Sequence, residues 1–126
     1  MSNAAGSLYE RLGGYDVIAK IMVDLTHRVR ADPKFVRFGG GRSTENLKRN
    51  DQLTIEYVCM LAGGPVHYLG RDMKISHAGL KITQDEWKAS MRHLADALDA
   101  HGVAPTERAE VLALFAAMER EIVEVP

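Results

Sequence analysis

Several features are scarce in this 126-residue sequence, and each absence narrows the class of protein. Cys59 is the single cysteine, which excludes an internal disulfide and argues against a disulfide-rich secreted scaffold. The apolar runs over residues 58–62 and 113–118 are far too short to span a bilayer. Residues 1–6 are small and polar, and they lack the basic start and apolar centre of a signal peptide. We therefore expect a cytoplasmic protein with no membrane partner.

An excess of charge of one sign is also absent. The chain has 16 basic and 17 acidic residues and a formal net charge of −1, which argues against nucleic acid or an anionic membrane as its main partner. Hydrophobic residues make up 46% and charged residues 26%, as in ordinary globular proteins. This length allows one hydrophobic core but not two. We expect a loose N-terminus over residues 1–6 and one domain over residues 7–124, present as a monomer or weak homodimer.

Glycine, proline and capping residues divide the chain into segments whose apolar residues recur at helical spacing. Ser7 with Glu10, and Thr83 with Glu86, have the spacing of capping boxes. No segment alternates for long enough to predict a strand, so we expect an all-α domain. The predicted helices cover residues 7–12, 15–31, 33–38, 44–62, 71–76, 84–101 and 105–122, with a loop over residues 39–41.

Histidines are the first candidates for metal ligands, but no His-Glu-x-x-His motif or cysteine pair is present. His27 lies opposite the apolar stripe of its predicted helix, which indicates a solvated side chain. His93 and His101 lie beside a stripe and are interpreted as structural or exposed, and His67 has no interpretable pattern. His77 ends a short predicted helix with a methionine one turn earlier. Its spacing leaves a structural histidine and a metal ligand both open.

The glycine-rich segment over residues 39–44 suggests a phosphate-binding loop, because such loops expose backbone N–H groups to anions. It lacks the spacing and lysine of a P-loop, and no predicted strand precedes it. We therefore interpret it as a loop between helices. Cys59 lies inside a predicted helix and is interpreted as a small core residue.

Five sequence blocks carry a resemblance to a known family: residues 7–14, 28–33, 61–65, 68–74 and 77–83. In this order and spacing, they make the sequence resemble group I truncated haemoglobins along nearly the whole chain. The last two blocks together are highly specific. The resemblance implies a truncated two-over-two globin fold around haem b (iron protoporphyrin IX), with His77 as the proximal ligand of the iron.

This role suits the chemistry of histidine, because a neutral imidazole binds iron while its second nitrogen donates to a backbone carbonyl near a helix end. The resemblance also implies apolar side chains against the macrocycle. Basic residues beside His77 would pair with the haem propionates, although a solvated position is nearly as good an interpretation for each. The apolar set is Phe38, Val58, Met73, Leu80, Ile82, Trp87, Met91, Val111 and Phe115, and the basic set is Arg71, Lys74 and Lys81.

The opposite, distal side departs from the family pattern. Phe38 is followed by Gly39 where many members have a second phenylalanine, so one wall of the pocket lacks a ring. Thr26 stands where many members carry a tyrosine that hydrogen-bonds the gas ligand. Counting back from the glycine pair at 63–64, the residues expected to face the iron are Asn50 and Thr54, with Gln52 as the fallback.

The resemblance implies reversible binding of O2, and of NO and CO, at pentacoordinate ferrous iron. An enzymatic alternative is conversion of NO to nitrate, or peroxidase-like turnover, with electrons from an unidentified reductase. A gas or redox sensor acting through a partner is a further alternative. A haem-free globin is the last alternative, because Gly39 and Thr26 depart from the family pattern around the haem.

Overall fold

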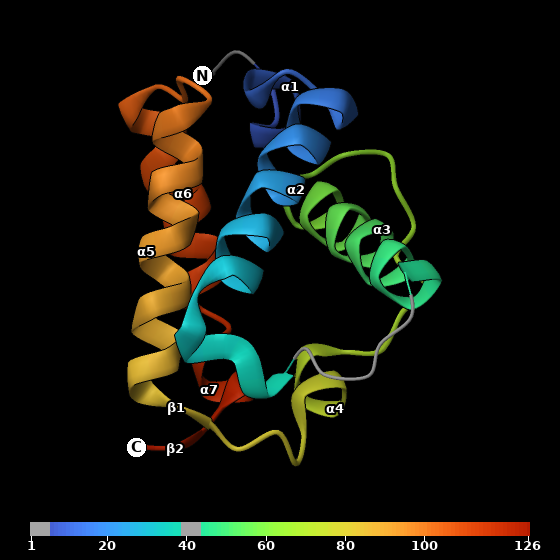
Figure 1. Cartoon of the computed structure of the whole chain (residues 1–126). Helices are drawn as coiled ribbons and strands as arrows, with labels where there is room; N and C mark the ends of the chain where they lie inside the picture. The colour runs from blue at the N-terminus through green and yellow to red at the C-terminus, as the bar shows by residue number, and fades with distance from the viewer. Residues whose placement is uncertain (1–5, 39–43) are drawn as a thin grey trace.

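The computed structural model describes residues 6–38 and 44–126, which fold into helices joined by loops, with a long loop over residues 62–72 (Figure 1). The all-α prediction is confirmed, whereas the expectations for residues 39–41 and for Gly39 lie outside the described residues. No helix within the described ranges is long and apolar enough to cross a membrane. The helices are α1 (Leu8–Leu12), α2 (Tyr15–Ala31), the 3-10 helix η1 (Pro33–Phe38), α3 (Thr44–Leu61), α4 (Met73–His77), α5 (Gln84–Ala100), α6 (Pro105–Ala116) and α7 (Glu119–Ile122).

Helix α2 lies at the centre of the main core. It packs against α3 on one side and α5 on the other, and α6 lies beside α5 (Figure 1). Cys59 on α3 is fully buried there, and burial raises the pKa of its thiol, so it is the small core residue that was predicted. The most deeply buried apolar residues of α2 and α5 are Ile18, Ile21, Met22, Leu94, Ala97 and Leu98.

Both predicted capping boxes are confirmed. The Ser7 hydroxyl accepts the Glu10 backbone N–H at 3.2 Å, and the Thr83 hydroxyl accepts the Glu86 backbone N–H at 3.1 Å. Each cap satisfies backbone donors that the first turn of a helix leaves without partners. The start of α5 is therefore determined locally, and it places Glu86 in the first turn.

The glycine pair after α3 ends the helix and also accommodates Tyr9 of α1. A Cβ atom on Gly64 would lie 2.5 Å from Cδ1 of the Tyr9 ring. The Tyr9 backbone N–H donates to the carbonyl of Ala62 at 2.9 Å, and its hydroxyl accepts the N–H of Tyr15 at 3.0 Å. The absence of a side chain at Gly64 thus lets α1 dock against the C-terminus of α3.

The C-terminal region differs from the prediction of one helix from Pro105 to Ile122. Helix α6 ends at Ala116, and the chain turns before α7, which brings Met118 and Ile122 against Trp87. Strand β2 (Val123–Val125) then pairs in parallel with β1 (Ile82–Thr83), directly before α5. These strands were not predicted, because two or three residues are too few to show an alternating pattern.

Candidate functional site

His77 is half-buried at the C-terminus of α4. Its Nδ1 atom lies 2.9 Å from the backbone oxygen of Met73, one turn earlier. Since a carbonyl oxygen can only accept, this contact assigns the ring proton to Nδ1. In that tautomer Nε2 carries the lone pair, and this is the form in which an imidazole binds a metal through Nε2.

Helix α4 begins two residues later than predicted, because Asp72 caps it. The Asp72 carboxylate accepts the backbone N–H of Ile75 at 2.7 Å, which starts the helix at Met73 rather than Arg71. At the other end Ala78 is extended and Gly79 has a φ of +82°. The helix therefore ends directly after His77 and holds this residue within its last turn.

An apolar cluster, here called the Trp87 cluster, lies beside α4. Its buried members are Trp87, Met118 and Ile122, and Met73 packs against them. Met118 and Ile122 belong to the predicted stripe of the last helix, but no role at the site was predicted for them. Other side chains packed against the Trp87 cluster are Tyr57, Leu61, Ile82, Met91, Phe115 and Val123.

The structure thus brings part of the predicted apolar set together. Met73, Ile82, Trp87, Met91 and Phe115 gather in or around the Trp87 cluster, and Met91 and Phe115 also contact the main core. The remaining members are placed elsewhere. Val58 and Val111 are buried in the main core, and Phe38 and Leu80 are half-buried.

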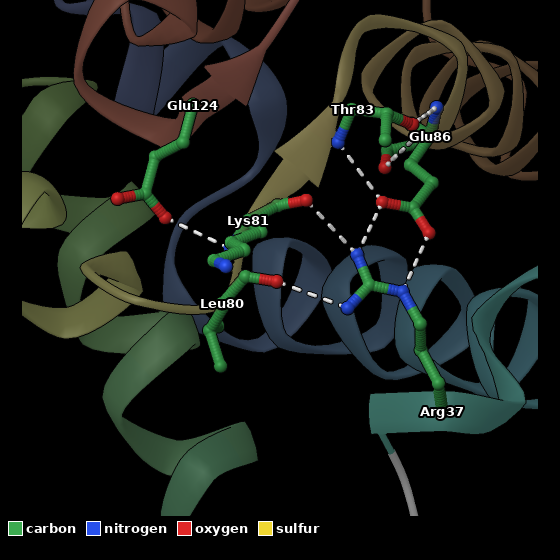
Figure 2. A network of polar contacts seen from close by, with 7 residues as sticks. Arg37, Leu80, Lys81, Thr83, Glu86 and Glu124 are labelled. Carbon is green, nitrogen blue, oxygen red and sulfur yellow. Dashed lines mark hydrogen bonds and ion pairs between the residues drawn. The ribbon is translucent and has the colours of Figure 1, made fainter.

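A polar network holds the loop that follows His77 (Figure 2). The Arg37 guanidinium donates to both carboxylate oxygens of Glu86, at 2.9 Å from Nε and 2.7 Å from Nη2. It also donates to the backbone oxygens of Leu80, at 3.0 Å, and Lys81, at 3.1 Å. The Arg37 guanidinium, followed by a hydrogen bond from the Thr83 backbone, lowers the pKa of the buried Glu86 carboxyl to about 2.

Glu124 of β2 binds the same loop from the other side (Figure 2). Its carboxylate accepts the backbone N–H of Lys81 at 2.9 Å and that of Gly79 at 3.2 Å, and these hydrogen bonds lower its pKa. Sequence reasoning missed the roles of Arg37, Glu86 and Glu124. Glu86 was visible as the second residue of a capping box, but its ion pair with Arg37 spans 49 positions and has no local signal.

Among the residues predicted for the distal side, the two threonine hydroxyls donate to carbonyls of their own helices. The Thr26 hydroxyl donates to the carbonyl of Val23 at 2.9 Å, and the Thr54 hydroxyl donates to the carbonyl of Asn50 at 2.9 Å. Gln52 is exposed, and its amide donates to the Tyr15 hydroxyl and to the Glu56 carboxylate. Asn50, the other amide among the predicted distal residues, is half-buried.

The remaining charged and histidine candidates lie at the surface or in ion pairs. Arg71, Lys74 and Lys81 are exposed, as are His27, His67 and His101. Within the described part of the chain, no group of three or more His, Cys, Asp or Glu side chains could hold a metal ion. A haem iron needs only one protein ligand, so His77 fits that role without such a group. The other histidine contacts join His93 to Asp32 at 2.8 Å and His101 to Asp24 at 3.2 Å.

The sequence comparisons decide the family. A family model described as bacterial-like globin matches residues 7–124. The chain belongs to the bacterial-like globin family. This globin is 34% identical over 116 residues to group 1 truncated hemoglobin GlbN of Mycolicibacterium paratuberculosis, covering 92% of this chain and 83% of that one. It is 30% identical over 98 residues to group 1 truncated hemoglobin GlbN of a Nostoc species, covering 78% and 80%.

Solved structures show the same fold. The Fe(III) form of truncated hemoglobin from Tetrahymena pyriformis matches this globin with a TM-score of 0.85 at 23% identity, over 94% of this chain and 98% of that one. THB1 of Chlamydomonas reinhardtii matches with a TM-score of 0.79 at 28% identity, over 97% and 100%. The predicted truncated globin fold and family are therefore confirmed. The family binds haem and gases, which supports the predicted function at that level.

Proposed function

We propose that His77 is the proximal ligand of haem iron in this globin, and that the protein reversibly binds O2, NO and CO. The observation that carries the proposal is the contact of His77 Nδ1 with the Met73 carbonyl, because it makes Nε2 the basic nitrogen of the neutral ring, on a helix whose Met73 side chain packs against the Trp87 cluster. When haem b is bound, its iron supplies the position at which a diatomic gas binds. Residues of this chain would orient the imidazole, exclude water and hydrogen-bond the bound gas.

Met73 has two roles in this proposal. Its backbone oxygen orients the imidazole of His77, and its side chain packs against the Trp87 cluster. Apolar surface beside the ligand excludes water, and in globins the polarity and access of the pocket decide between gas binding and other chemistry. The predicted apolar contacts that gather there would therefore line the macrocycle.

On the distal side we assign the hydrogen bond to a bound gas to Asn50 before Thr54 or Thr26. Both threonine hydroxyls already donate to carbonyls one turn earlier in their helices. The amide of Asn50 offers two N–H donors from a half-buried position. The exposed basic residues Arg71, Lys74 and Lys81 would meet the propionates at the haem edge.

Proximal ligation is tested with His77→Ala, and with His27→Ala as the control, because His27 is an exposed histidine remote in sequence from α4. Purified apoprotein is titrated with haem, and spectra of the ferric, ferrous and CO forms are recorded. We expect the wild type and His27→Ala to show the same Soret band and ferrous–CO spectrum. His77→Ala should bind haem loosely or not at all, and added imidazole should restore the spectrum. A normal ferrous–CO spectrum of His77→Ala without imidazole would contradict the assignment.

A further inference from the structure

We propose that Arg37, Glu86 and Glu124, here called the proximal latch, hold His77 in position for the haem iron. The inference rests on the proposed function, because it concerns the same iron ligand. The latch acts on residues 79–83, the loop between His77 and α5 (Figure 2). Its members lie on η1, α5 and β2, far apart in the sequence.

Arg37 ties this loop to α5. Its guanidinium makes two hydrogen bonds to Glu86 and two to the carbonyls of Leu80 and Lys81. Glu86 is only 7% exposed, and it also accepts the backbone N–H of Thr83 at 2.9 Å. Because Glu86 is anchored in the first turn of a long helix, Arg37 fixes the two carbonyls relative to α5.

Glu124 completes the restraint from the opposite side. The backbone of Lys81 is bonded through its N–H to Glu124 and through its carbonyl to Arg37. Lys81 has a φ of +53°, a left-handed conformation that a non-glycine residue keeps only where its surroundings enforce it. Pairing of Ile82 with Val123 extends the contact with the C-terminal strand.

The loop transmits this restraint to His77 over a short distance. The Leu80 backbone N–H donates to the carbonyl of His77 at 3.2 Å, and Glu124 holds Gly79, two residues after the histidine. The side preceding the histidine is fixed by the Asp72 cap of α4. Since α4 is little more than one turn long, its own backbone hydrogen bonds are too few to keep the helix in place. The position of α4, and with it the Met73 carbonyl that orients the imidazole, therefore depends on the latch.

The test uses haem-loaded protein with Arg37→Ala, Arg37→Lys and Glu124→Gln. Arg108→Ala is the matched control, because it breaks another two-contact arginine–carboxylate pair, with Asp99. Three quantities are measured: the iron–histidine stretching band of the ferrous form, the rate of haem transfer to an acceptor apoprotein, and the urea midpoint of unfolding. The stretching band reports on the histidine itself, which a general loss of stability does not shift.

For Arg37→Ala we expect a shifted or split stretching band and about tenfold faster haem transfer, equivalent to about 1.4 kcal/mol. Arg37→Lys keeps the charge without the planar fork, so it should restore only part of the wild-type behaviour. Glu124→Gln places an NH2 group opposite one of two N–H donors and should give a smaller change in the same direction. Arg108→Ala should keep the wild-type band and transfer rate.

An unchanged band and transfer rate in both Arg37→Ala and Glu124→Gln would overturn the latch, even if their urea midpoints fell. If Arg37→Ala does not fold, Arg37→Lys and Glu124→Gln decide by the same two measurements. A wild type that takes up no haem, or binds it without His77, would overturn the proposed function and the latch together. Normal ligation by His77 with unaffected variants would overturn the latch alone.

Discussion

The proposed proximal and distal sides of this globin are built in different ways. Backbone groups of the proximal loop, residues 79–83, are bonded by side chains from η1, α5 and β2. On the distal side, the hydroxyls of Thr26 and Thr54 bond to carbonyls of their own helices. The position of the loop at residues 79–83 therefore depends on contacts between distant parts of the chain. The hydrogen-bonding groups on the proposed distal side belong instead to single side chains on stable helices.

This difference separates the expected effects of mutation. A change in the Trp87 cluster or the proximal latch disturbs packing or backbone, so it should alter stability and haem retention. A change at Asn50 or Thr54 removes a donor from a helix that remains folded, so it should alter gas kinetics. The following predictions test this separation.

The largest effect is expected from Trp87→Ala. Trp87 is 7% exposed and forms the Trp87 cluster with Met118 and Ile122, so truncation leaves a cavity. Such losses cost about 3–5 kcal/mol of the free energy of unfolding. The change Phe38→Ala, at a half-buried ring outside the Trp87 cluster, should cost clearly less. Urea unfolding of both variants measures this difference, and equal losses would contradict the special weight given to the Trp87 cluster.

The next effect concerns acid. The carboxyl pKa of Glu86 falls from an ordinary 4.5 to about 2, chiefly because of Arg37, so the folded state binds this proton more weakly than the unfolded state. Its contribution is therefore fully present above about pH 4.5 and is lost as the pH falls towards 2. The shift corresponds to at most about 3 kcal/mol, and less because Arg37 is partly solvated.

Glu86→Gln tests this prediction because it removes the titrating group but keeps an acceptor for the Thr83 N–H. The variant should be less stable than the wild type at pH 7, and the difference should shrink between pH 4.5 and 2. Asp85→Asn, an exposed neighbour in the same turn, serves as the control. A stability difference that stays constant from pH 7 to pH 3 in urea titrations would show that the ion pair is not responsible.

Distal variants should change O2 release by a smaller free energy. One hydrogen bond is worth about 0.5–1.5 kcal/mol, or roughly two- to twelvefold in an equilibrium constant. Asn50→Ala should speed O2 dissociation with little effect on CO, and Thr54→Val should act in the same direction but less, because its hydroxyl already donates to a carbonyl. Thr26→Tyr should slow O2 dissociation. Stopped-flow kinetics measure these rates.

The wild type should also release O2 and autoxidise faster than family members that carry the distal tyrosine. Slow release from the wild type, unaltered by Asn50→Ala and Thr54→Val, would mean that the distal register is wrong. Gln52 or an ordered water would then become the better donor, although Gln52 binds Tyr15 and Glu56 in this structure.

The smallest effect is expected at the haem edge. Arg71, Lys74 and Lys81 are exposed, and an exposed ion pair contributes about 0–1 kcal/mol. Changing all three residues to alanine should modestly speed haem transfer at low salt, and salt should abolish the difference. Alanine at the exposed residues Lys20, Lys48 and Lys88 provides a control of equal charge. Identical transfer rates for the two triple variants would remove the propionate assignment.

Much of the fold was predictable because its signals are local. Helical periodicity located α2, α3, α5 and α6, and both capping boxes have the predicted contacts. The break after Ala116 was not predictable, because the apolar stripe through Met118 and Ile122 fits a continuous helix equally well. The chain bends there because these two side chains then reach Trp87.

The candidate site also has one part that the sequence predicted and another part that only the tertiary structure revealed. The sequence, through its resemblance to group I truncated haemoglobins, indicated His77 as the candidate ligand and part of the apolar set that gathers in or around the Trp87 cluster: Met73, Ile82, Trp87, Met91 and Phe115. Only the tertiary structure decided that Arg37, Glu86 and Glu124 meet around the loop after His77. The physical reason is the separation along the sequence between the residues that interact. Periodicity and capping act within a few residues, whereas an ion pair across 49 positions exists only after the helices have packed and brought its partners together.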